Sequence, residues 1–438
     1  MRIDKGEWGN WITQGWSLDQ VIISEEDRII LRALANDFRE LCERQIEQEK
    51  ISLWKKHNDL VETRPLLLVD MENGWNECLR FDRDIKCKGY MAQDWEMWLR
   101  KEIVYARNIK DDKPLTPVFY IPHRAVNTEW GIGEKHFGSG GDKNIAYTWE
   151  PVLSKYSDDE FQNLDVDSVI EDPVVKVDEE ASQAAFNMAK DVFDGILDVQ
   201  FRTFWFWSSH VVLAYATYRG MEQMMLDVYD YPDKMKEILQ KFTNGYINKL
   251  KFLEANNLLF DNSSNTFVGS GGLGWTNQLH PKAGEVKLKQ MWGLCEAQEA
   301  QVSPAVFKEF ILPCHMQVAK MFGLVCYACC EPADIVWDYV KTLPNLRRVS
   351  VSQWAGMERM SELLGKDYVY SYKANASDVA TTHMDENIVR TSLRKVLEYT
   401  KGKNNVEIVL KDLHTIGNKP EQVYRWVEIA REEIARIY

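Results

Sequence analysis

From Arg64 onward, short apolar runs alternate with longer amphipathic stretches, and this alternation constrains the fold more than any other feature of the sequence. A run such as PLLLVDM (65–71) is almost entirely apolar, as is typical of a strand buried on both faces. The stretches between such runs repeat apolar residues every three to four positions, as helices packed on a sheet do. Strands and helices that alternate in this way predict an α/β fold with a parallel sheet.

The number of strands narrows the choice of sheet. The clear strand candidates are 65–71, 116–121, 199–207, 324–330, 346–352, 367–373 and 406–412, and weaker ones are 258–262 and 289–294. The helical candidates between them are 180–197, 211–256, 304–322, 333–342, 356–364 and 385–401. Roughly eight strands in a chain of this length favour a TIM (β/α)8 barrel over an open sheet.

A separate helical pattern precedes the first strand. Ser24 stands before three acidic residues, as an N-cap does, and apolar residues recur with helical spacing from Ile29 to Leu41. We expect one or two helices over residues 24–57, either packed on the barrel or forming the arm of a homodimer. The domain organisation predicted is a helical extension over 1–60 and a TIM barrel over 61–438.

Charge and hydropathy exclude several classes of partner. The net charge is −14, which gives no electrostatic footprint for nucleic acid or an anionic membrane. No apolar run approaches the ~18 to 20 residues of a membrane span, and the N-terminus lacks the apolar core of a signal peptide. A cytoplasmic protein is therefore expected, in which the eight cysteines do not form a disulfide framework.

Enzymes built on this barrel carry their active sites at the carboxyl ends of the strands. Asp70 and Glu72 follow the first expected strand, with Trp75 close behind, and His123 follows the second. The later strand ends contribute Trp205, Trp207, His210, Glu296, Cys329, Glu331, Trp354 and Asn375. If all these strands end at one face of the barrel, these side chains surround a common site.

Two local motifs leave their roles open. Alternation along a strand puts Cys326, Ala328 and Cys330 on one face and Cys329 on the other, so only one of the last two cysteines faces the barrel interior. The segment 269–274 matches the GxGxxG dinucleotide pattern by letter, but no helix pattern follows it, as that site requires. A Gly-rich loop or lid is the better interpretation of this segment.

Two segments carry a resemblance to a known family. Arg219-Gly220-Met221-Glu222, followed by Asp230-Tyr231-Pro232 and Glu254-Ala255-Asn256, is similar to a stretch of uroporphyrinogen decarboxylases. SPAVFKEFILP (303–313) resembles a further segment of that superfamily, in the expected order and spacing. The resemblance covers about residues 64–438. It implies a TIM barrel and an activity of the tetrapyrrole decarboxylase or of the methyltransferases that serve corrinoid proteins.

The first strand argues against the decarboxylase. That enzyme places arginines after this strand to hold substrate carboxylates, whereas this chain has Glu72, Asn73 and Gly74. An acidic loop cannot clamp a polyanionic tetrapyrrole. The resemblance therefore favours the corrinoid-dependent methyltransferase branch of the superfamily.

This sequence also departs from the methyltransferase branch, at the position of its zinc site. Relatives that act on thiols bind zinc through His-x-Cys-Gly and a later cysteine, but here Tyr327 replaces the histidine while Cys329 keeps the cysteine. No cysteine stands near Asn375, where the later one is expected. The thiol-activating zinc site is thus incomplete. What remains is the other half of the chemistry, removal of a methyl group from a donor onto a corrinoid protein.

That reaction needs an acid or a Lewis acid at the leaving atom, an aromatic slot and an open mouth for the partner's corrinoid. The catalytic candidates are His123, Glu72 and Asp70. The substrate-binding candidates are Trp75, Trp205, Trp207, Trp354, His210 and Asn375. A metal, with zinc the ion considered, has the candidate ligands Glu296, Cys329 and Glu331, with His123 as a fourth.

The preferred hypothesis is therefore a methyltransferase that demethylates a small donor, with an aryl methyl ether as the favoured substrate and a corrinoid protein as partner. Methylamines and halomethanes remain open as donors. One alternative is a decarboxylase or lyase of a small aromatic acid that needs no corrinoid. Another is a non-catalytic protein that binds the corrinoid partner.

Overall fold

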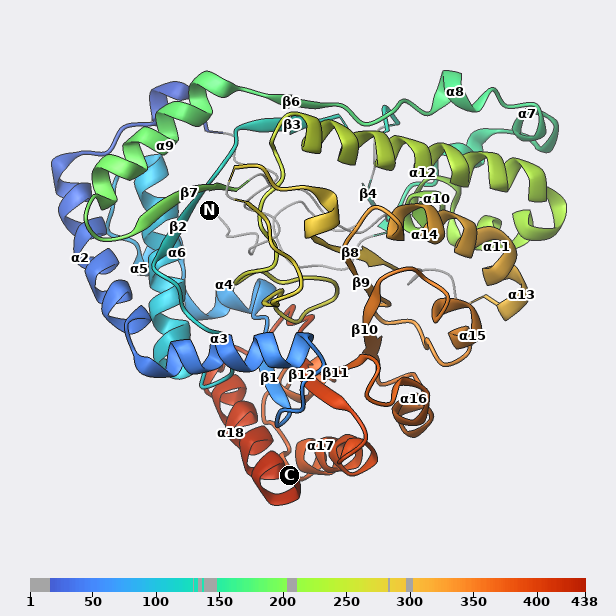
Figure 1. Cartoon of the computed structure of the whole chain (residues 1–438). Helices are drawn as coiled ribbons and strands as arrows, with labels where there is room; N and C mark the ends of the chain where they lie inside the picture. Colours follow the sequence, from blue (N-terminus) through green and yellow to red (C-terminus); the bar gives the residue numbers. More distant parts are fainter. Residues whose placement is uncertain are drawn as a thin grey trace.

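The computed structural model describes residues 16–128, 130–132, 136–137, 148–202, 211–282, 284–296 and 302–438. Six parallel strands form its central sheet in the order β1-β12-β11-β10-β9-β8 (Figure 1). The bounds of these strands are β1 Leu66–Val69, β8 Trp292–Cys295, β9 Leu324–Tyr327, β10 Leu346–Val351, β11 Val369–Ala374 and β12 Asn405–Leu410. All six lie within expected strands or within two residues of them, so the parallel α/β prediction is confirmed for this part of the chain.

The first strand shows why an apolar run predicts burial on both faces. Leu66 and Leu68 pack with Val409 and Phe267 on one face of the sheet, whereas Leu67 and Val69 belong to the large core on the other face. Alternate residues of a strand point to opposite faces, so both faces must be covered for a run of this kind to be stable.

A second, smaller parallel sheet pairs β2 (Val118–Pro122) with β7 (Asp198–Arg202). Within the described residues no hydrogen-bonded ladder joins this pair to the six strands. The closed TIM barrel expected from the strand count is therefore not shown, although these two sheets hold eight parallel strands between them. Two antiparallel pairs complete the strands, β3 (Ala125–Asn127) with β6 (Val175–Val177) and β4 (His136–Phe137) with β5 (Thr148–Trp149).

The strand expected at 258–262 is wrong. This segment has no regular structure, and it contacts β8 through one side chain instead of a ladder. The Asn262 amide donates to the Trp292 carbonyl and accepts from the Trp292 N–H, at 2.9 Å in each case. The side-chain amide of Asn262 thus makes hydrogen bonds to both backbone groups of Trp292, which a neighbouring strand would otherwise make.

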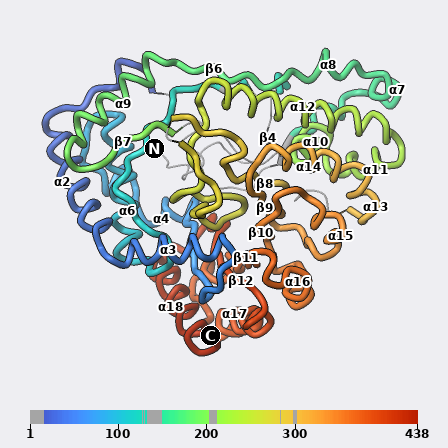
Figure 2. The backbone as a smooth tube through the Cα atoms, viewed as in Figure 1, coloured from blue at the N-terminus to red at the C-terminus, as the bar shows by residue number. Residues whose placement is uncertain are grey.

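Helices cover the outside of the strands (Figures 1 and 2). The longer ones are α2 Glu25–Cys42, α3 Gln45–Asn58, α6 Tyr90–Asn108, α9 Glu179–Phe193, α10 Val211–Arg219, α11 Met221–Asp230, α12 Pro232–Ala255, α14 Leu312–Ala319, α16 Met357–Leu364, α17 Glu386–Thr400 and α18 Pro420–Ile437. The shorter ones are α4 Trp75–Cys78, α5 Phe81–Asp84, α7 Asp158–Gln162, α8 Val166–Val169, α13 Pro304–Val306 and α15 Trp337–Val340. Among the described residues, no helix has the length and apolarity of a membrane span.

The helical region expected over 24–57 is confirmed and consists of two helices, α2 and α3. Ser24 caps α2 by accepting from the Asp27 N–H. The single helical period expected over 211–256 is instead three helices. Gly220, at φ +91°, separates the first two, and Pro232 begins the third. A proline lacks the N–H that a continuous helix needs, which explains the second break.

The Gly-rich segment, 269–274, packs against side chains of β9, β10 and β12 on one face of the six-stranded sheet. A side chain at Gly269 would place its Cβ 2.7 Å from Cys326, and one at Gly272 would lie 2.5 Å from the Glu407 carboxylate. Both glycines also have positive φ, where other residues are strained. The loop thus packs closely on this face of the sheet and is no dinucleotide site, as the sequence indicated.

Candidate active site

A cavity of about 120 Å³ opens beside the carboxyl end of β1, where three hydrophobic clusters meet. Met71 comes from the large core, Trp95 from the core of α2, α6 and α9, and Phe267 from the cluster that contains Leu66 and Leu68. The cavity also lies between β1 and β2, where no ladder is formed in the described structure. Ligand sites often form at such junctions between packed units.

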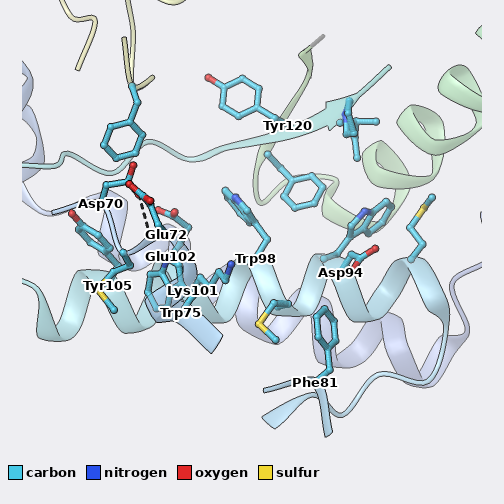
Figure 3. Close-up of a pocket in the computed structure, with 18 of the residues that line it drawn as sticks. Asp70, Glu72, Trp75, Phe81, Asp94, Trp98, Lys101, Glu102, Tyr105 and Tyr120 are labelled. Atoms are coloured by element: carbon cyan, nitrogen blue, oxygen red, sulfur yellow. Dashed lines mark hydrogen bonds between the residues drawn. The ribbon is translucent and has the colours of Figure 1, made fainter. Parts of the chain in front are cut away.

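One face of α6 forms the long wall of this cavity (Figure 3). The lining side chains are Met91, Asp94, Trp95, Met97, Trp98, Lys101, Glu102 and Tyr105. Most recur at intervals of three or four residues, so one helix face presents them to the same space. Tyr105 is held in place because its hydroxyl donates to the Val69 carbonyl at 2.8 Å.

Two carboxylates enter the cavity from the end of β1, Asp70 and Glu72. The Glu72 N–H donates to Asp70 Oδ1 at 3.3 Å, and Glu72 itself has φ +42°. Burial and then the nearby Asp412 carboxylate raise the pKa of Glu72, and Lys411 opposes them. Glu72 can therefore hold a proton at higher pH than an ordinary glutamate.

The end of β12 positions Glu72. The Asp412 N–H donates to Glu72 Oε1 at 2.9 Å, and Lys411 Nζ forms an ion pair with Asp412 at 2.8 Å. Asp412 has φ +61°, a strained conformation for a residue other than glycine. Such strain persists only where surrounding contacts impose it and is frequent at functional sites.

The end of β9 lies next to Lys411, which follows β12. Lys411 Nζ is 3.9 Å from Cys329 Sγ, and the Ser270 hydroxyl is 3.0 Å from that sulfur. The alternation expected along 326–330 fails here because Ala328 has φ +71°, which turns the chain after β9. Cys326 and Cys329 therefore both face the Gly-rich loop, while Cys330 is exposed.

A different charged cluster lies deeper inside the six-stranded sheet. Arg348 and Glu407 form an ion pair at 3.0 Å, and His57 Nε2 is 3.2 Å from the same carboxylate. Ser371 donates to Glu407, and Lys373 Nζ donates to Ser371 Oγ at 2.5 Å. Burial lowers the pKa of Lys373 to about 8. We call these five residues the interior cluster.

The sequence-based candidates are spread over several places. Asp70, Glu72 and Trp75 line the cavity. His123 does not line it and instead stacks on Phe201 at 4.3 Å, where burial lowers its pKa. Trp354 is 70% exposed outside the cavity, and Asn375 caps a short helical turn by accepting from the Ser377 N–H. Trp205, Trp207 and His210 lie outside the described residues.

The three metal candidates are buried, but the described structure gathers no three His, Cys, Asp or Glu side chains as a metal ion would require. Glu331 accepts the Cys329 N–H at 2.9 Å, and the Lys411 ammonium group lies 3.9 Å from the Cys329 sulfur. The contact with Cys330, burial and the Glu296 carboxylate raise the pKa of this thiol. Within the part of the chain that the structure describes, Glu296, Cys329 and Glu331 are not gathered as the three ligands of a zinc ion. That site remains a prediction from the sequence, and no step below depends on it.

Residues on α6 were missed by the sequence analysis. Asp94, Trp98, Lys101, Glu102 and Tyr105 belong to a helix between the first two strands, and the rule of strand ends does not select helix positions. Their spacing along the helix was the available signal. It marks one face, but a sequence does not say whether that face meets a core or a cavity.

Comparisons with known proteins add little to this description. No family model and no curated protein matches the chain. Among solved structures, a methyltransferase from Methanosarcina mazei matches 69% of this chain and 76% of its own, with 10% sequence identity and a TM-score of 0.39. Similarity at that level does not transfer an activity or a substrate. The assignment to the superfamily remains a prediction from the motifs quoted above.

Proposed function

We propose that this chain is an enzyme that moves a methyl group from a small methylated donor to the Co(I) corrinoid of a partner protein. The observation that supports this most is the aromatic cavity with Asp70 and Glu72 at the carboxyl end of β1. The sequence resemblance supplies the reaction class, and the cavity supplies a place for a small donor. Co(I) corrinoid is the nucleophile that such a reaction requires, and this chain must bind, orient and activate the donor.

Glu72 is the group suited to activation. When the methyl group is bound to oxygen, as in an aryl methyl ether, the departing oxygen needs a proton. The raised pKa of Glu72 allows it to supply that proton, and the Asp412 N–H fixes its carboxyl group at the cavity edge. When the methyl group is bound to a cationic nitrogen, the amine departs neutral and needs no proton.

The aromatic side chains would orient the donor. Trp75, Trp98 and Tyr120 line the space beside the carboxylates (Figure 3). Flat apolar walls hold a methylated group by dispersion and exclude water from the reacting carbon. The alternative lyase acting on an aromatic acid fits less well, because the described lining carries four carboxyl groups against two lysines, an excess of negative charge that disfavours an anionic substrate.

The test uses the whole protein with a corrinoid protein reduced to Co(I) and a panel of O-, N- and S-methyl donors. We expect one class of donor to methylate the corrinoid, followed by its change in visible absorption, only when this protein is present. A panel without methyl transfer would overturn the proposal. Release of carbon dioxide from an aromatic acid without corrinoid would support the lyase instead.

A variant sharpens this assay. Glu72→Gln is expected to reduce turnover of an ether donor by about 100-fold or more, as loss of a general acid does. Glu358→Gln, which makes the same chemical change at an exposed position of α16, is the matched control and keeps full activity. Equal activity of both variants would remove Glu72 from the mechanism.

A further inference from the structure

We propose that the donor class of this cavity is an N-methylated cation, such as a quaternary ammonium compound. This inference rests on the proposed function for the transfer step, but binding of the cation can be measured without it. The lining charges, the ring faces and the size of the cavity support it independently of each other.

The charges that line the cavity are unequal. Asp70, Glu72, Asp94 and Glu102 are acidic, whereas Lys101 and Lys113 are the basic residues among the described lining positions. Glu102 and Lys113 form an ion pair at 2.9 Å. The acidic excess favours a cation over a neutral or anionic ligand, and low-dielectric walls strengthen that preference because they screen charge poorly.

The rings of the cavity already hold cations. Lys101 Nζ lies 5.6 Å from the centre of the Trp75 ring, and Lys113 Nζ lies 4.5 Å from that of Tyr105. Both distances are within the range of a cation–π interaction. The protein's own ammonium groups thus show that these aromatic faces and their carboxylate neighbours make a favourable environment for positive charge.

Further aromatic residues line the cavity beyond the lysines. Figure 3 shows Trp98 and Asp94 on the part of α6 that precedes Lys101, with Phe81 on one side and Tyr120 on the other. Trp98 is kept in orientation by an edge-on contact with Phe119 at 5.0 Å. Aromatic faces grouped around a carboxylate are the arrangement that recognises quaternary ammonium groups, which cannot donate hydrogen bonds.

The size of the cavity agrees with a compact donor. Its volume of about 120 Å³ is many times the ~10 to 15 Å³ that one water molecule needs. A trimethylammonium group with a short chain is compact enough for such a space.

The transfer step balances for this donor. The bond between the methyl carbon and nitrogen breaks, and its electron pair stays on nitrogen, which leaves as a neutral tertiary amine. The Co(I) acceptor supplies the electron pair of the new bond to the methyl carbon. Asp70 and Glu72 then act as counter-ions that orient the donor, and no proton transfer is required.

The experiment compares choline with 3,3-dimethylbutan-1-ol, in which carbon replaces the charged nitrogen without a change of shape. Isothermal titration calorimetry of the full chain, without corrinoid, should show choline binding at least about tenfold more tightly, since desolvated cation–π and charge interactions both favour it. Equal or weaker binding of choline would overturn the inference.

Variants locate the bound cation. Asp94→Asn and Trp98→Leu should each weaken choline binding by about tenfold and leave the binding of the neutral alcohol unchanged. The surface variant Glu358→Gln serves as control for the loss of one negative charge. Circular dichroism establishes that each variant is folded, so unchanged choline binding in both cavity variants would contradict the proposed location.

The two proposals can fail separately. Choline binding without methyl transfer to a Co(I) corrinoid protein from any donor of the panel would overturn the proposed function and keep the cation site. Methyl transfer from an aryl methyl ether by a protein that does not bind choline would keep the proposed function and overturn the cation site.

Discussion

Glu407 in the interior cluster is fully buried and Glu72 at the cavity is half-buried, and their pKa values move in opposite directions. Burial by itself would raise the pKa of Glu407, yet Arg348, His57 and Lys373 lower it to about 2. Burial raises the pKa of Glu72, and Asp412 raises it further. The difference arises from the neighbours. Two cations, Arg348 and Lys373, act on Glu407, whereas Asp412 and Lys411 act on Glu72 in opposite directions.

This difference separates a structural carboxylate from one suited to chemistry. Glu407, with its pKa lowered to about 2, is ionised at neutral pH, and it links its strand to the neighbouring ones through the ion pair with Arg348 and the hydrogen bond from Ser371. Glu72 lies at a cavity, on a strained backbone, and can change its protonation state. Perturbed carboxylates in cavities are the better candidates for function.

The largest expected effect tests whether the ion pair of Glu407 stabilises the fold. Arg348→Met removes the main partner of the buried Glu407 and should lower the free energy of unfolding by about 3 to 5 kcal/mol. Urea denaturation at pH 7 measures it. The double variant Arg348→Met/Glu407→Leu should recover part of the loss, because no buried charge is then left alone. A single variant with wild-type stability would show that Glu407 is not held by this ion pair.

The next effect concerns Lys373, the member of the interior cluster whose charged form is destabilised by burial. Its pKa is about 8 in the folded protein, against 10.5 for an ordinary lysine, so the unfolded chain binds more protons between these values. Lys373→Met should therefore stabilise the protein by up to roughly 3 kcal/mol below pH 8, with the gain disappearing toward pH 10.5. Urea denaturation of both proteins at pH 7 and pH 10 checks this. A gain that does not depend on pH would indicate better packing instead.

A smaller effect tests the cavity. A bound cation favours the charged form of Glu72, so choline affinity should rise with pH until Glu72, whose pKa is raised above 4.5, is fully ionised. Glu72→Gln should abolish the part of this pH dependence that Glu72 contributes, while changing the unfolding free energy by less than about 1 kcal/mol. Calorimetry across the acidic range measures the first and urea denaturation the second. An unchanged pH profile in the variant would assign the titration to another carboxylate.

The smallest effect tests which of the two cysteines after β9 is accessible and reactive, as a residue at a functional site would be, and which is buried. Cys330 is exposed, and the hydrogen bond from Cys329 lowers its pKa, whereas Cys329 is buried beside Ser270. A thiol reagent should modify one cysteine quickly, and Cys330→Ser should remove that fast phase without loss of stability. Cys78→Ser, at a half-buried position, is the control. Loss of the fast phase in Cys329→Ser alone would show that the chain after Ala328 turns the other way.

The two regions also differ in how far the sequence predicted them. Apolar runs predict β1 and β12 because strands buried on both faces need side chains of one kind, and the strand-end rule then selects Asp70 and Glu72. Neither rule selects Trp98 or Lys101, which lie on a helix face. The Cys329 orientation was left open for a related reason, since one positive φ at Ala328 reverses the alternation.

The sequence by itself determined the parallel α/β architecture, the N-terminal helical region and the acidic end of β1, since these follow from periodicity and short-range order. Only the tertiary structure decided that β2 and β7 pair apart from the six strands, that the Gly-rich loop packs on one face of the sheet, and that α6 lines the cavity. It also decided that Glu407 meets cations and Glu72 meets Asp412. The reason is that pKa values, cavities and strand partners depend on contacts between residues far apart in the chain, which local patterns do not encode.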